Sequence, residues 1–149
     1  MKKQFLLTSI LVLALAACSD VKPLSTPSSP SASNQSPQTS PFESQTNESG
    51  AVTVKVTPNV LQAGAPAEFL IAMDTHSVDL VDDMLRVVVL RDDSGKEYAP
   101  AGWDGVASGG HHRAGNIRFA ALPANVQSVT LIVKGIANIP ERVYQWQLK

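Results

Sequence analysis

The sequence has one cysteine, eight aromatic residues and almost no excess of either sign of charge. A single cysteine cannot form a disulfide within the chain, and it cannot supply a cysteine-rich zinc site. Twelve Lys and Arg residues against thirteen Asp and Glu residues leave a formal net charge of −1. Because nucleic-acid binding needs a basic surface, we expect no nucleic acid among the partners. The 149 residues allow one folded domain.

The longest hydrophobic run is too short to cross a membrane. Lys2 and Lys3 precede an apolar stretch over residues 5–15, whereas a membrane-spanning helix needs about 20 apolar residues. A short positive region followed by an apolar run of this length is typical of a secretory signal peptide. Residues 1–17 are therefore predicted to direct export and to be removed.

The end of this run carries a more specific signal. Leu15-Ala16-Ala17-Cys18 resembles the lipobox of bacterial lipoproteins. The resemblance implies cleavage before Cys18, a diacylglyceryl thioether on its sulfur and a free amine for a further acyl chain. One acyl chain holds a protein only marginally, but two or three anchor it stably. The resemblance thus implies that acylated Cys18 binds the lipid bilayer, in the cell membrane or the outer membrane, with the protein facing outside the cytoplasm.

Residues 18–50 are rich in small polar residues and proline. Ten serines and five prolines lie between positions 19 and 50, against three sizeable apolar residues. Such a composition cannot bury enough apolar surface to offset the entropy lost on ordering. We predict a lipidated Cys18 followed by a disordered linker, with the folded domain at residues 51–149.

Residues 51–149 alternate apolar and polar residues in short runs, the period of half-buried β-strands. The run 79–91 also fits helical spacing, with Asp79 as a potential N-cap, but its β-branched end favours a strand. The expected strands are 52–57, 68–75, 84–91, 96–98, 116–120, 129–134 and 141–148.

About seven short strands with no long helix predict an all-β fold, an immunoglobulin-like antiparallel β-sandwich. The two cysteines that mark many such domains are missing, so this likeness is architectural, and a small barrel is the alternative. Trp103 or Trp146 is the expected centre of the core. Arg142, beside the aromatic residues of the last strand, is expected to be exposed.

The segment 99–115 is predicted to be a long glycine-rich loop. Long loops of a compact domain often carry function. The candidate ligand-binding residues there are Trp103, Asp104, His111, His112 and Arg113. In the alternative interpretation the loop folds back so that Trp103 plugs the sheet.

Histidines and carboxylates suggest a second hypothesis, a copper or zinc site. Imidazole suits both metals, and the candidate ligands are His76, His111, His112, Asp74 and Asp104. Adjacent strand residues point to opposite faces, so His111 and His112 cannot both bind one metal without a bend. A structural His–Asp hydrogen bond between the loop and the strand end at Asp74 is the alternative, and no cofactor is the main expectation.

Catalytic motifs give no support for an enzyme. The segment 105–109 misses the nucleophile elbow G-x-S-x-G by one position, and the sequence contains neither a metalloprotease motif nor a phosphate-binding loop. We therefore expect a membrane-anchored extracytoplasmic lipoprotein with a non-enzymatic binding or assembly module for an unidentified envelope protein or ligand. The alternative is an envelope copper- or zinc-binding protein that uses His76 and the His111-His112 loop.

Overall fold

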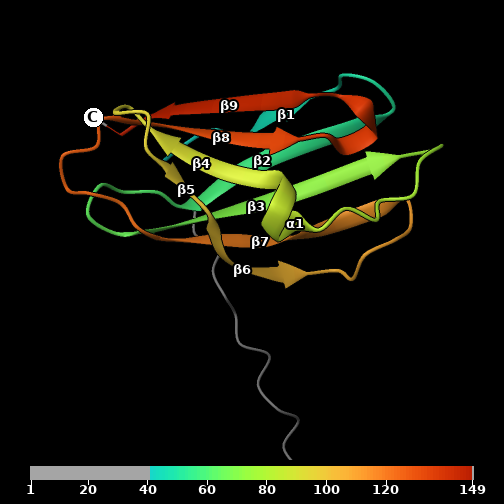
Figure 1. Cartoon of the computed structure of the whole chain (residues 1–149), viewed down its shortest axis with the longest axis horizontal. Coiled ribbons are helices and arrows are strands. Elements are labelled where there is room, and N and C mark those ends of the chain that lie inside the picture. The colour runs from blue at the N-terminus through green and yellow to red at the C-terminus, as the bar shows by residue number, and fades with distance from the viewer. Residues whose placement is uncertain (1–40, 149) are drawn as a thin grey trace, which may run out of the picture. The chain divides into compact units, whose positions relative to one another are not determined.

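A computed structural model describes residues 41–148, so the predicted signal peptide, Cys18 and residues 18–40 of the predicted linker lie outside the described part. Within it the chain forms antiparallel β-structure in two sheets (Figure 1). The strands are β1 (Gln45–Asn47), β2 (Val52–Val60), β3 (Pro66–Thr75), β4 (Val88–Asp92), β5 (Glu97–Tyr98), β6 (Pro100–Gly105), β7 (His112–Ala121), β8 (Ser128–Lys134) and β9 (Glu141–Gln147). The helical turns are α1 (Met84–Val87) and the 3-10 turn η1 (Ile136–Asn138).

Sheet A has the strand order β1-β2-β3-β7-β6, and sheet B has the order β5-β4-β8-β9. The two sheets form the two layers seen in Figure 1. Period-two alternation turns every second side chain of β2, β3, β7 and β9 inward. Phe69 lies at the centre of the core, with its ring centroid 5.3 Å from that of Trp146 and 6.0 Å from that of Phe119. The all-β prediction and the choice of Trp146 as a core residue are confirmed.

The described chain has nine strands rather than about seven, and both additional strands fall where sequence predicted none. One is β6, which occupies part of the predicted long loop 99–115 and pairs with β7. The polypeptide passes from β5 in sheet B to β6 in sheet A at Ala99, so one continuous segment joins the two layers. The true connection between β6 and β7 is residues 106–111, which is a much shorter loop than predicted.

The other additional strand is β1, which lies in the predicted linker. β1 pairs with β2, and the Gln45 side chain donates to the carbonyl of Gln145 at 2.5 Å and accepts from its amide at 3.2 Å. Trp146 Nε1 donates to the carbonyl of Glu43 at 3.0 Å. The predicted boundary at residue 50 is therefore wrong, because contacts with β2 and β9 order residues that composition alone assigns to the linker.

The prediction that residues 84–91 form one strand is also wrong. Residues 84–87 make the helical turn α1, and β4 begins at Val88. Asp83 is the N-cap: its side chain accepts from the amide of Leu85 at 3.0 Å, and its carbonyl accepts from Arg86 and Val87. The helical alternative thus describes the start of this segment, although its cap is Asp83 and not Asp79.

The connections between strands divide between two ends of the sandwich. The chain enters at residue 41 beside the end of β9, and the connections 61–65, 93–96 and 122–127 lie at the same end, which we call the proximal end (Figure 1). The connections 48–51, 76–83, 106–111 and 135–140 lie at the other, the distal end. A ten-residue strand such as β3 separates the ends by about 33 Å. Between residues 41 and 148, no helix has the length and apolar character needed to span a membrane.

Candidate functional site

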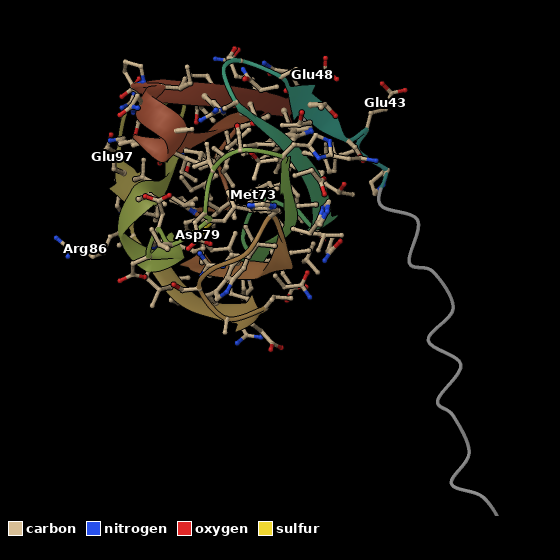
Figure 2. All side chains as sticks on the ribbon, turned by 90° about the vertical axis from the view of Figure 1, so that its right-hand side faces the viewer. Glu43, Glu48, Met73, Asp79, Arg86 and Glu97 are labelled. Carbon is tan, nitrogen blue, oxygen red and sulfur yellow. The ribbon has the colours of Figure 1, made fainter. Side chains whose placement is uncertain are left out.

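Two of the distal connections are bound together by backbone hydrogen bonds. Leu80 N donates to Gly110 O at 3.0 Å, and Gly109 N donates to Leu80 O at 2.9 Å. The amide of Gly110 also donates to the Asp79 carboxylate. Gly109 and Gly110 have φ values of 109° and 80°, which glycine adopts without strain. The segment after Asp74 and the His111-His112 segment therefore meet at one end of the sandwich (Figure 2 looks onto this end and labels Asp79).

Arg113 holds the same two connections from inside. Only 5% of this residue is exposed. Its guanidinium donates to the carbonyls of Val106 at 3.2 Å, Leu80 at 3.3 Å and Asp82 at 2.5 Å. A buried charge is tolerated when such polar partners surround it. Because its Nε and Nη1 donate to these carbonyls, Arg113 is a buried clamp for the distal connections.

Trp103 lies beside this clamp on the inner side of β6. Its ring centroid is 5.5 Å from Cζ of Arg113, and it packs against the core. The ring also covers the cross-strand glycine pair Gly105 and Gly115, because a Cβ placed on Gly115 would be 2.6 Å from Trp103 Cζ2. Trp103 therefore has a packing position, as in the plug alternative, and its Nε1 is a buried donor without a partner among the described residues.

The predicted metal ligands are only partly brought together. His112 Nδ1 lies 2.7 Å from Asp74 Oδ1, across the register that pairs these residues on β7 and β3. His76 and His111 are exposed, and Asp104 is on β6, where its Oδ2 is 3.9 Å from Nη1 of Arg118. Within residues 41–148, no group of three or more His, Cys, Asp or Glu residues is close enough to hold a metal ion. The structure thus contains the His–Asp pair without a complete ligand set.

Arg142 is a second clamp that sequence reasoning missed. It was expected at the surface, but it is 1% exposed. Its guanidinium donates to the carbonyls of Ile136 at 2.9 Å, Ser49 at 2.8 Å and Val52 at 3.3 Å, while Nε has no partner in the described chain. Burial lowers the pKa of this guanidinium. The available signal was its spacing, since Arg142 shares the inward face of β9 with Tyr144 and Trp146.

The outer surface of the distal end is partly apolar. Val81, Val106 and Leu85 are 59%, 54% and 45% exposed. Val81 and Val106 are joined through the clamp and through Ser108, whose hydroxyl donates to the carbonyl of Val81 at 3.3 Å. Three of the six large hydrophobic residues exposed in the described chain thus belong to segments at or next to the distal end.

Comparisons of this chain with protein-family models, with curated proteins and with solved structures give no match.

Proposed function

We propose that this chain is an extracytoplasmic lipoprotein, anchored through acylated Cys18, whose immunoglobulin-like β-sandwich is a non-enzymatic binding or assembly module. The observation that carries the proposal is the separation of the two ends. The chain enters the sandwich at the proximal end, and the connections 76–83 and 106–111 project from the distal end. An anchored module of this kind presents its distal end to partners at the envelope.

The state of the distal connections supports a role in recognition. Arg113 and the hydrogen bonds of Gly109 and Gly110 fix their backbones before any partner arrives. A surface that is already ordered loses less conformational entropy on binding than a mobile loop. Val81 and Val106 supply apolar contact area there.

The proposal is tested by placing a photoreactive residue at one position of the full-length protein in its native membrane. Val106 at the distal end is compared with Gln62, an exposed residue of the proximal end. We expect cross-linked adducts with an envelope component from position 106 and none from position 62. Equal adduct patterns at both positions, or none at position 106, would contradict a distal recognition end.

The anchor is tested separately with Cys18→Ala. The unchanged protein is expected in the membrane fraction with acyl chains detectable by mass spectrometry of its N-terminal peptide. The variant is expected to lose the acyl chains and to leave the membrane fraction. A variant whose N-terminal peptide still carries the same acyl chains would refute lipidation at Cys18.

One observation favours the copper- or zinc-binding alternative. A metal-binding histidine commonly donates its second ring nitrogen to a carboxylate, and the pair formed by His112 and Asp74 leaves Nε2 of an exposed imidazole available. Calorimetric titration of the full chain with Zn²⁺ or Cu²⁺, with and without His112→Ala, distinguishes the alternatives. Stoichiometric binding that the substitution abolishes would favour the metal-binding function, and no heat of binding would favour the binding module.

A further inference from the structure

The four edges of the two sheets are not equally protected. Edge strands expose unpaired backbone groups and can pair with another chain. β1 has three residues and β5 has two, and the backbone of β9 is engaged at Gln145 by the side chain of Gln45. β6 has six residues, and the sheet order gives it a neighbouring strand on one side only.

The pairing of β6 with β7 determines which backbone groups point away from the sheet. Val106 N donates to Ala114 O at 2.9 Å, directly after the register that pairs Gly105 with Gly115. Hydrogen-bonded and non-hydrogen-bonded pairs alternate along an antiparallel ladder. The amide and carbonyl groups of Trp103 and Gly105 therefore point away from β7, toward the open edge.

The outer face of this edge carries complementary charges. Gly102 is paired with Arg118, and the guanidinium of Arg118 reaches over Gly102, because a Cβ placed on Gly102 would lie 3.4 Å from Nη2. Asp104 lies two residues farther along β6 and is exposed, with only a 3.9 Å contact to Arg118 of its own chain. A cation thus reaches the edge at Gly102, and a carboxylate stands next to it on the same face.

We propose that β6 of one molecule pairs antiparallel with β6 of a second copy, about a twofold axis at Trp103. This register makes the two Trp103 residues exchange their outward backbone hydrogen bonds. It sets Gly102 directly opposite Asp104 of the second copy, so that each Asp104 meets the Arg118 that reaches over the facing glycine. The contact is self-complementary and occurs twice.

The neighbouring register explains why the axis is at Trp103. An axis at Asp104 would also join outward-pointing backbone groups, but it would oppose two carboxylates directly, and like charges at opposed positions destabilise a strand pair. Leu85, an exposed apolar residue, belongs to α1, which lies against β6. The proposal is independent of any ligand at the distal end.

Disulfide cross-linking tests this register. Two variants, Gly102→Cys and Asp104→Cys, are each made in the full chain with Cys18→Ser and purified in detergent micelles. Opposed residues in a non-hydrogen-bonded pair have Cα atoms about 4.5 Å apart, within the range for a disulfide. Two copies of residue 104 would lie about 8 Å apart in this register, beyond that range. We expect the mixture of variants to yield severalfold more disulfide-linked dimer than either variant alone.

The proposal is overturned if no disulfide-linked dimer forms, or if the mixture and each single variant give equal yields. It is also overturned if Asp104→Cys alone gives the highest yield, which would indicate the register with its axis at Asp104. Charge reversal gives a second measurement. Arg118→Glu in both variants is expected to weaken association by roughly five- to thirtyfold, whereas Lys55→Glu, an exposed charge on the distant strand β2, is expected to leave the yield unchanged. An equal effect of the two reversals would refute the role of Arg118.

Discussion

The glycine pair beneath Trp103 predicts a large effect for a very small substitution, Gly115→Ala. The added Cβ would be 2.6 Å from Cζ2 of Trp103 and 2.8 Å from the carbonyl oxygen of Asp104, and it would also overlap Cα of Gly105. Two of these three atoms belong to the backbone of β6, and the third belongs to a packed ring. None can move without displacing the strand, so the added methyl group has no space.

Overpacking a close-packed site costs about 1–3 kcal/mol, and more when the backbone must move. We therefore expect Gly115→Ala to lower the free energy of unfolding by roughly 3 kcal/mol. For a domain of this size that loss corresponds to a fall of about 12–24 °C in Tm. Urea denaturation followed by tryptophan fluorescence measures the change, since Trp103 lies over the substituted site.

Gly102→Ala on the same strand is the matched control. Its Cβ would meet only the flexible end of Arg118, at 3.4 Å. Surface substitutions of this kind usually change stability by less than about 0.5 kcal/mol. If the two variants unfold at the same urea concentration, the close approach of β6 and β7 at the glycine pair is refuted.

Three further predictions concern buried polar groups. Arg142→Met removes the donor for the carbonyls of Ser49, Val52 and Ile136 and is expected to lower the free energy of unfolding in urea by roughly 2–4 kcal/mol. The control Arg118→Met, at an exposed position, is expected to change it little. Equal losses of stability in the two variants would contradict the role of Arg142 as a clamp. The hydrogen bond from the Ser94 hydroxyl, followed by those from Tyr98 and two amides, lowers the pKa of Asp92. The ionised Asp92 therefore stabilises the fold above about pH 4, and this stabilisation is lost as the pH falls further. Asp92→Asn should make stability less dependent on pH in the acid range, and an unchanged pH dependence would disprove the role of Asp92. Burial raises the pKa of Tyr98 and of Tyr144 to about 12, so stability should fall between pH 10 and 12, and absorbance titration should detect no phenolate with a pKa near 10.

The strands that sequence predicted correctly are those whose apolar residues alternate on a period of two. β3 and β9 show this pattern over their whole length, because one face of each lies in the core. β6 lacks the pattern, since Gly102 and Gly105 are half of its last four residues and have no side chains to alternate. Its strand conformation comes from pairing with β7 and from Trp103, and these are tertiary contacts that local composition does not encode.

β1 was missed for a related reason. Its sequence, Gln45-Thr46-Asn47, is as polar as the linker before it. It is ordered by what it contacts: the backbone of β2 on one side and the backbone of Gln145 on the other. A polar side chain that reproduces the hydrogen bonds of a missing strand leaves no signature in hydrophobic periodicity.

The structure brings the predicted candidate segments together, but the contacts of Arg113 were not predicted. Sequence indicated the segments around His76 and His111-His112, and the structure places both at the distal end. Arg113 was a candidate ligand-binding residue because it lies in the glycine-rich segment 99–115, which was predicted to be a long loop. Burial of Arg113 depends on three carbonyl groups from two other segments, and their positions are fixed only by the folded chain.

The two buried arginines together link all four distal connections in pairs. Arg113 joins the connection 76–83 to the connection 106–111, and Arg142 joins the connection 48–51 to the connection 135–140. Each guanidinium donates to three backbone carbonyls, so it constrains the path of the chain and leaves the outward side chains free to vary. Such an end can present Val81, Val106 and the histidines in a fixed arrangement without a disulfide or a metal. Because β6 lies at the side of the sandwich, association through its edge would leave this end accessible in both copies.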